Sequence, residues 1–170
     1  MNIKKVVVGQ LQENCYVLNI NNDYLLIDPG DEANKIIKEI KGNLLGILIT
    51  HSHQDHIGAL NDILDYKKVP IYNYLNKNQD ITISNFNFKV IDFPGHKEDL
   101  VGFLFNNKLF SGDFIFKGTI GRIDLPGGNF KEMQKSIAKV LSYNKDLIIY
   151  PGHGDITTLS EEKENLKLFL

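Results

Sequence analysis

The six residues His51-Ser52-His53-Gln54-Asp55-His56 place three histidines and a carboxylate in one short run. The run follows a continuous apolar stretch, residues 44–49, which predicts a buried strand. On an extended segment the side chains of His51 and His53 point to the same side. Buried together, these groups would lack hydrogen-bond partners unless a cation bound them. The run therefore predicts a metal site, and it restricts the chain to folds that bring further ligands to the end of this strand.

The other two of the chain's five histidines lie in two short segments, Pro94-Gly95-His96 and Pro151-Gly152-His153. A single histidine of this kind is more often an ordinary core or surface residue than a ligand. Both, however, follow predicted strands, as Asp113 does. The apolar residues that end the four strands are Ile49, Phe93, Phe110 and Tyr150. Four strand ends at one edge of a sheet assembly would bring these polar side chains together.

The ligand types indicate which metals the site would bind. Imidazole and carboxylate groups suit zinc, iron or manganese. The five histidines, with Asp55 and Asp113, exceed the four ligands of a tetrahedral zinc site. Shared between two ions about 3.5–4 Å apart, they would form a dinuclear site with a bridging carboxylate and hydroxide. We therefore expect two divalent metal ions, zinc by preference, with iron or manganese as alternatives.

Length and composition restrict the class of protein. A chain of 170 residues suits one domain spanning 1–170. The net charge is −2, from 19 basic and 21 acidic residues, so there is no excess of basic residues that would predict a nucleic-acid-binding surface. The single cysteine, Cys15, excludes internal disulfides and cysteine zinc knuckles. The apolar run at 6–8 falls short of the ~7–15 residues of a signal-peptide core, and no stretch approaches the ~20 of a membrane span. We expect a cytoplasmic protein without nucleic-acid or membrane partners.

Strands and helices are interspersed along the chain, as in an α/β protein. Strands are predicted at residues 3–8, 15–20, 24–27, 44–49, 69–72, 81–84, 88–93, 100–105, 108–110 and 147–150. Helices are predicted around 33–40 with Asp31 as N-cap, around 57–64, after Asn129, and at 161–168. Glu132 would complete a capping box with Asn129. A glycine-rich loop is predicted at 112–128.

The polar segments together resemble a known family. Residues 50–58 resemble the H-x-H-x-D-H signature of the metallo-β-lactamase superfamily. Residues 93–96, 110–113 and 150–154 resemble its later motifs in the right order, and Asp28-Pro29-Gly30 resembles an early motif. The matches run from about residue 14 to 165, nearly the whole chain. The resemblance implies a mixed α/β (α+β) fold. In this fold two sheets lie between two layers of helices, as an αββα sandwich, with the site at the sheet edges.

Carried over residue by residue, the resemblance implies two ions with three ligands each and one shared ligand. The ligands of the first ion would be His51, His53 and His96, those of the second Asp55, His56 and His153, and the bridging one Asp113. Asp55 would also act in catalysis by orienting the attacking water.

Within this superfamily, residues 121–128 resemble the G-R-x-D motif of glyoxalase II-like hydrolases and of their persulfide dioxygenase relatives. The stretch from Thr157 to Asn165 resembles the short, single-domain bacterial members. The resemblance implies a hydroxyacylglutathione hydrolase-like enzyme. Such an enzyme uses a hydroxide that bridges the metals to hydrolyse a thioester, here a glutathione-type or other small acyl thioester.

The sequence departs from this family in two respects. The usual H-T-x-G-S motif is here His96-Lys97-Glu98-Asp99-Leu100, which alters the loop beside the metal site. Classical members bind glutathione through a C-terminal helical domain, which is not expected in a chain of this length.

Other functions remain as alternatives. The nearest is a persulfide dioxygenase, which would use one iron held by His51, His96 and Asp113. A flavodiiron-type site would require a carboxylate in place of Gln54, and a tRNA-processing nuclease would require a basic arm. A non-catalytic metal-binding module would have a site without exchangeable water.

Three further residues have a functional and a structural interpretation. Arg122 could bind a substrate carboxylate through two hydrogen bonds, or form a salt bridge with Asp124. Asp28 could support a metal-binding histidine through a hydrogen bond, or cap a turn. Cys15 lies in a predicted strand and is interpreted as a small buried hydrophobe rather than a nucleophile.

Overall fold

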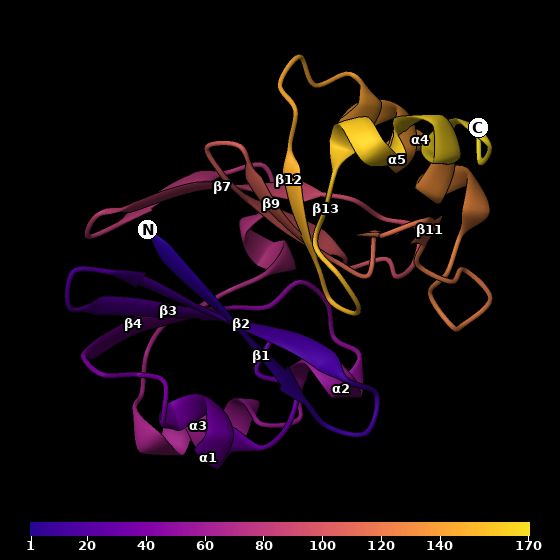
Figure 1. Cartoon of the computed structure of the whole chain (residues 1–170). Coiled ribbons are helices and arrows are strands. Elements are labelled where there is room, and N and C mark those ends of the chain that lie inside the picture. The colour runs from indigo at the N-terminus through magenta and orange to yellow at the C-terminus, as the bar shows by residue number, and fades with distance from the viewer.

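The computed structural model describes residues 1–170 and has two β-sheets packed face to face, with helices on their outer sides (Figure 1). In the first sheet the strand order follows the sequence. Its strands are β1 (Asn2–Val8), β2 (Glu13–Ile20), β3 (Asp23–Ile27), β4 (Asn43–Leu48) and β5 (Ile71–Tyr72). Strands β1 to β3 are antiparallel, and β3 to β5 are parallel. Helices α1 (Ala33–Ile37) and α3 (Leu60–Tyr66) cover its outer face.

The second sheet has the strand order β13-β12-β9-β8-β7-β6. Its strands are β6 (Asp80–Ile83), β7 (Phe86–Asp92), β8 (Val101–Phe105), β9 (Lys108–Gly112), β12 (Ile148–Pro151) and β13 (Thr157–Thr158). All its pairings are antiparallel except that of β9 with β12. Helices α4 (Phe130–Leu141) and α5 (Leu159–Lys167) cover its outer face. The predicted αββα sandwich is thus confirmed.

Smaller elements connect these layers. Helix α2 (Gln54–Ile57) follows β4, and a short 3-10 helix, η1 (Tyr74–Asn76), follows β5. Strands β10 (Ile115–Phe116) and β11 (Thr119–Ile120) pair as a small separate hairpin. None of the helices has both the length and the apolar character needed to cross a membrane.

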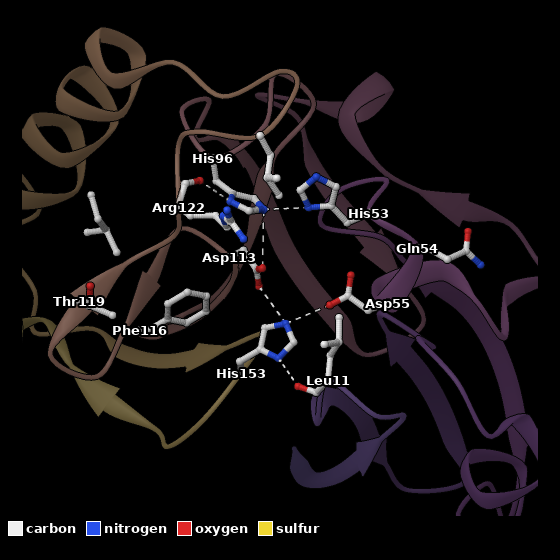
Figure 2. Close-up of a pocket in the computed structure, with 12 residues that line it drawn as sticks. Leu11, His53, Gln54, Asp55, His96, Asp113, Phe116, Thr119, Arg122 and His153 are labelled. Carbon is white, nitrogen blue, oxygen red and sulfur yellow. Dashed lines mark hydrogen bonds and ion pairs between the residues drawn. The ribbon is translucent and has the colours of Figure 1, made fainter.

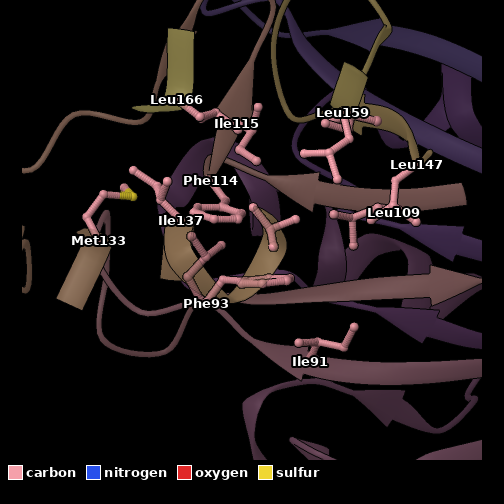
Figure 3. Close-up of a cluster of buried hydrophobic side chains, with 13 residues drawn as sticks. Ile91, Phe93, Leu109, Phe114, Ile115, Met133, Ile137, Leu147, Leu159 and Leu166 are labelled. Carbon is pink, nitrogen blue, oxygen red and sulfur yellow. The ribbon is translucent and has the colours of Figure 1, made fainter. Parts of the chain in front are cut away.

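The core is divided into layers because alternate residues of the central strands face opposite sides. Along β2, Tyr16 and Leu18 face the space between the sheets, whereas Cys15 and Val17 pack with residues of α1 and α3. A third cluster fills the space between the second sheet and helices α4 and α5 (Figure 3). Strands buried on both faces are apolar throughout. Continuous apolar runs therefore predicted β4 and β12, and Cys15 is buried as predicted.

Two helix predictions need correction. Asp31 was predicted as an N-cap, and this is wrong: α1 begins after Glu32, whose φ is 49°, and no side chain caps it. The Asp31 carboxylate instead accepts a hydrogen bond from the backbone nitrogen of Glu32 at 2.6 Å. The helix predicted around 57–64 is divided into α2 and α3. The backbone nitrogen of Ala59 donates to the carbonyl of Pro29 at 3.0 Å, which holds this connection against the loop after β3.

The region after β9 also differs in detail from the prediction. The loop predicted at 112–128 contains the β10–β11 hairpin. Asn129 caps α4, as predicted, by accepting a hydrogen bond from the backbone nitrogen of Glu132. Only this half of the predicted capping box forms, because the Glu132 carboxylate pairs with Lys135 at 2.7 Å.

Candidate metal centre

Loops that follow four β-strands bring the seven predicted ligands to one edge of the two sheets. The loop after β4 carries His51 and His53 and continues into α2, which carries Asp55 and His56. The loops after β7, β9 and β12 each carry one further predicted ligand. In chain order these are His96, Asp113 and His153. Five of the seven side chains are labelled in Figure 2, where they converge on one pocket.

The first group consists of three imidazoles. Nε2 of His51 lies 3.0 Å from Nδ1 of His53, and Nε2 of His96 lies 2.9 Å from the same Nδ1. A neutral imidazole has one donor nitrogen and one acceptor nitrogen, so Nδ1 of His53 can donate to only one of the two rings. Three ring nitrogens at this separation are the arrangement that ligation of one metal ion requires.

Hydrogen bonds outside this group fix two of its tautomers. The backbone carbonyl of Arg122 can only accept, so Nδ1 of His96, 2.7 Å away, carries the hydrogen. The Thr50 hydroxyl donates to Asp28 at 2.6 Å, so its oxygen accepts from Nδ1 of His51 at 3.0 Å. In both histidines Nε2 therefore presents its lone pair to the centre of the group, as a metal ligand does.

The second group consists of two imidazoles and a carboxylate. Nδ1 of His56 donates to Asp28 at 2.9 Å, and Nδ1 of His153 donates to the carbonyl of Leu11 at 3.1 Å. When these rings are neutral, both Nε2 atoms carry lone pairs, and both face Asp55. Oδ2 of Asp55 lies 3.2 Å from Nε2 of His153 and 3.7 Å from Nε2 of His56.

Asp113 lies between the two groups, with one carboxylate oxygen directed at each. Its Oδ1 is 3.2 Å from Nε2 of His56 and 3.7 Å from Nε2 of His153. Its Oδ2 is 3.6 Å from Nε2 of His96. A carboxylate in this position can ligate two ions at once, which is the role that the resemblance implied for Asp113.

The charges of the second group favour a bound cation. Burial opposes protonation of His56, yet the carboxylates of Asp113 and Asp28 outweigh it and raise the pKa of that imidazole well above its usual value. The hydrogen bond from His153 holds the pKa of Asp55 at about 2. The negative potential that would keep a proton on His56 would equally attract a metal ion.

In the first group, by contrast, the imidazole pKa values of His51 and His53 are lowered. Burial, with help from His56, lowers the pKa of His51 well below its usual value. Burial also lowers the pKa of His53, with His96 as the second cause. Neutral imidazoles are the form that ligates metals, so these two rings need not lose a proton to bind an ion at neutral pH.

Two buried atoms support the fit of metal ions to these residues. Nε2 of His56 and Oδ1 of Asp113 are buried without a hydrogen-bond partner. Such atoms cost free energy unless something binds them. A divalent cation would satisfy both, because Nε2 of a neutral His56 and Oδ1 of an ionised Asp113 each have a lone pair and lie 3.2 Å apart.

Each Pro-Gly-His segment is held through its proline carbonyl by a side chain from another element. The hydroxyl of Ser136, on α4, donates to the carbonyl of Pro94 at 2.7 Å. The side chain of Asn14, on β2, donates to the carbonyls of Pro151 and Gly154, both at 3.0 Å. Tyr16 also donates to Pro151, at 2.7 Å. These contacts fix the backbone on either side of His153 and two residues before His96. No sequence motif marked them.

Glycine is required between Pro151 and His153 because the backbone passes directly against the ligands. A Cβ atom on Gly152 would lie 2.4 Å from Oδ1 of Asp113 and 2.6 Å from Cε1 of His56. Neither ligand could give way without leaving its position, since both are buried.

Glu13 is a residue of the centre that the sequence did not indicate. It is fully buried, its two carboxylate oxygens have no hydrogen-bond partner, and Oε1 lies 3.8 Å from Nδ1 of His56. Burial above all raises the pKa of Glu13 to about 10, so it is protonated at neutral pH. A glutamate at a strand start is usually exposed, so its position gave no signal.

The two interpretations of Arg122 are resolved in part. Its guanidinium forms a two-hydrogen-bond pair with Asp124, at 2.8 and 2.7 Å, and both side chains are exposed. Its backbone carbonyl orients His96. The side chain also lines the pocket, so the salt bridge and a role toward a substrate are compatible.

A pocket of about 570 Å³ opens over the ligands, a volume suited to a small molecule. Five of the predicted ligands form part of its surface. The other lining residues are Leu11, Gln54, Phe116, Thr119, Ile120, Arg122 and Leu125. Apart from the proposed metal ligands, the lining thus includes no histidine, aspartate, lysine, tyrosine or glutamate that could act as a general acid.

Comparisons with known proteins find a single family and a shared fold. Residues 8–82 match the family described as the metallo-beta-lactamase superfamily. The chain is 32% identical to the hydroxyacylglutathione hydrolase GloC of Haemophilus influenzae, over 97% of this chain and 96% of that protein. The structure is similar to that of the BLEG-1 B3 metallo-beta-lactamase, with a TM-score of 0.90 and 30% identity over 99% of both chains. It is also similar to TTHA1623 in a di-iron-bound form, with a TM-score of 0.81 and 31% identity over 94% of this chain and 96% of the other.

Proposed function

Because this chain belongs to the metallo-β-lactamase superfamily, we propose that it is a metal-dependent hydrolase that cleaves small acyl thioesters, in the manner of a hydroxyacylglutathione hydrolase. One observation carries the proposal. Two groups of three ligands face each other across Asp113, beneath a pocket large enough for a small molecule.

The ligand assignment follows from the two groups. His51, His53 and His96 would hold one ion, and a second set would hold the other. That set is Asp55, His56 and His153, and Asp113 would serve both ions. Zinc is the proposed metal, with iron or manganese as alternatives. When bound, such ions lower the pKa of water to about 7 and act as Lewis acids toward a carbonyl oxygen.

Asp55 has a further role in this proposal. The carboxylate stays ionised at neutral pH, since its pKa is about 2, and it borders the pocket. With one oxygen toward the metal ligands, the other can accept a hydrogen bond from a water molecule and orient it toward a substrate carbonyl. Asp55 is therefore the proposed catalytic residue.

The residues of the pocket favour a thiolate leaving group. A thiolate leaves without strong acid assistance, because the pKa of a thiol is about 8.5. An amine or alkoxide leaving group needs a proton donor, and the only histidines and aspartates of the pocket are proposed metal ligands, while it has no lysine, tyrosine or glutamate. The name of the Haemophilus influenzae relative and the similarity of residues 121–128 to the G-R-x-D motif also support a thioester.

The setting of the enzyme is proposed on the same basis. It would work as a single domain, residues 1–170, in the cytoplasm, on a small-molecule thioester that Arg122 helps to bind. The net charge of −2 gives no support to a nucleic-acid partner.

Metal analysis combined with an activity assay tests the function. Protein purified without added metal is analysed for its elements and assayed with S-lactoylglutathione. Two zinc equivalents and thioester cleavage are expected. Two zinc equivalents without cleavage of this or a simple acyl thioester would refute the thioesterase. One iron per chain with sulfite formation from glutathione persulfide would instead establish the dioxygenase alternative.

The ligand assignment has its own test. Asp55→Ala should bind one ion in place of two, whereas Asp62→Ala, which removes an exposed carboxylate of α3, should bind both. Full metal content in Asp55→Ala would contradict the assignment.

A further inference from the structure

The end of the pocket next to His153 is apolar. The side chain of Leu11, in the turn between β1 and β2, lines the pocket and is 67% exposed. Opposite it, the ring of Phe116 lies against the imidazole of His153, with centroids 6.0 Å apart (Figure 2). Large apolar side chains that are open to water beside a reactive centre favour contact with an apolar group, because that contact removes apolar surface from water.

The position of Leu11 is fixed by the metal centre itself. Its carbonyl accepts the hydrogen bond from Nδ1 of His153, so the backbone under this side chain is tied to a ligand. The β1–β2 turn is held from the other side as well, because the backbone nitrogen of Gly9 donates to Glu32 at 3.0 Å. The apolar wall is therefore built into the site.

The other end of the pocket, next to His96, carries a positive group. The Arg122 guanidinium lines the pocket close to His96, whose Nδ1 donates to the Arg122 carbonyl. The partner of this guanidinium, Asp124, is exposed, and exposed ion pairs exchange partners readily. A carboxylate or phosphate of a substrate can thus bind Arg122.

We propose that this protein prefers thioesters whose acyl group is apolar, with that group between Leu11 and Phe116 and the anionic thiol carrier toward Arg122. The inference rests on the proposed thioesterase function and specifies its substrate class. The orientation follows from charge, because biological thiol carriers bear carboxylates or phosphates. These anionic groups can pair with Arg122. Between Leu11 and Phe116 they would lose water without gaining a hydrogen-bond partner.

The first arm of the test varies the acyl group on one thiol. S-acetyl, S-butyryl and S-hexanoyl glutathione are compared with S-lactoylglutathione. Burial of each added methylene should raise kcat/KM by up to about fourfold, and the hydroxyl of the lactoyl group should give it a lower kcat/KM than butyryl. Leu11→Ser should flatten the dependence on chain length. Leu75→Ser, which changes a side chain 84% exposed and outside this pocket, should preserve it.

The second arm varies the thiol. S-butyryl glutathione is compared with the butyryl ester of neutral N-acetylcysteamine. The neutral carrier should raise KM about tenfold, and Arg122→Ala should remove most of that difference. Equal KM values in the unaltered protein would overturn the placement of the carrier.

A binding measurement keeps this inference separate from the proposed function. The affinities of the metal-loaded protein for acetate, butyrate and hexanoate are measured by calorimetry, which needs no turnover. Affinity that rises with chain length and falls in Leu11→Ser supports the apolar site even if no thioester is cleaved. Cleavage of thioesters with no dependence on chain length, or affinity for lactate above that for butyrate, would overturn the inference and leave the thioesterase standing.

Discussion

Oδ2 of Asp28 lies 2.9 Å from Nδ1 of His56. The same oxygen accepts the hydroxyl hydrogen of Thr50, whose oxygen in turn accepts from Nδ1 of His51. One buried carboxylate thus orients a proposed ligand of each ion, one directly and one through a hydroxyl. Of the two interpretations of Asp28 from the sequence, the geometry favours support of histidines.

Substitution Asp28→Asn should weaken binding of both ions. An amide offers one oxygen in place of two to the three groups that donate to Asp28, namely the Thr50 nitrogen, the Thr50 hydroxyl and His56. Loss of such supporting hydrogen bonds typically costs 10–100-fold in metal affinity, so we expect roughly that loss for the ion held by His56 and less for the other. Competition with a chromophoric chelator measures both. Asp62→Asn is the control, and equal affinities in the two variants would contradict the role.

Substitution Asn14→Asp should weaken one ion selectively. The carboxylate cannot donate to the carbonyls of Pro151 and Gly154, so the loop of His153 loses two bonds. We expect the affinity for the second ion to fall about tenfold, with the first ion retained. Asn19→Asp is a matched control, since Asn19 also donates to two backbone carbonyls, far from the site. Equal loss of both ions would indicate a general folding defect instead.

Substitution Ser136→Ala should show the reverse selectivity. It removes the bond that holds the carbonyl of Pro94, two residues before His96. The first ion should bind several-fold more weakly, and the second should be unaffected. Ser142→Ala removes a comparable bond at the end of α4, to Lys139, and serves as the control. Site-resolved titration with cobalt, followed by its absorption spectrum, distinguishes the two ions. Weakening of the second ion alone would exclude this role of Ser136.

Substitution Gly152→Ala should abolish binding of the second ion. The added methyl group would displace Asp113 or His56, because both lie closer than van der Waals contact allows. Gly154→Ala is the matched control: its φ of 76° makes alanine strained, but the added Cβ meets no atom within 4 Å. Elemental analysis of the two purified variants should give one ion or none for the first and two for the second.

Removal of the metals should lower the thermal stability. Chelation leaves Nε2 of His56 and Oδ1 of Asp113 without partners. Each ion present at about 1,000 times its Kd stabilises a native state by roughly 4 kcal/mol, which corresponds to about 8–16 °C in Tm per ion at this chain length. Differential scanning calorimetry with and without chelator measures the change. A Tm that chelation leaves unaltered would argue against resident ions.

The strands were predictable because most of them are buried on at least one face and carry continuous or alternating apolar residues. Residues 44–49 illustrate this, since they predicted β4 (Asn43–Leu48) to within one residue at each end. Helix α1 illustrates the opposite case. Its start at Ala33 is set by the left-handed conformation of Glu32 and by contacts with the β1–β2 turn, and no local pattern encodes these.

The convergence of the proposed ligands was predictable because these residues are chemically distinctive and follow strands, whereas the residues that support them are not distinctive. Asn14 and Ser136 act only through backbone carbonyls more than 40 residues away, as the separations of 137 and 42 residues show. Glu13 is buried although its residue type is usually exposed. Such residues become visible only when the fold has brought distant segments together.

The separation between Asn14 and Pro151 also has a consequence for biosynthesis. A nascent chain that has emerged only through α4 already contains the three proposed ligands of the first ion, but it lacks β12 and His153. Domains fold as units during and after synthesis, and β2 can engage the His153 loop only at the end of that process. Loading of the proposed second ion would therefore be delayed until the two halves of the sandwich have joined, and its presence would mark a completely assembled molecule.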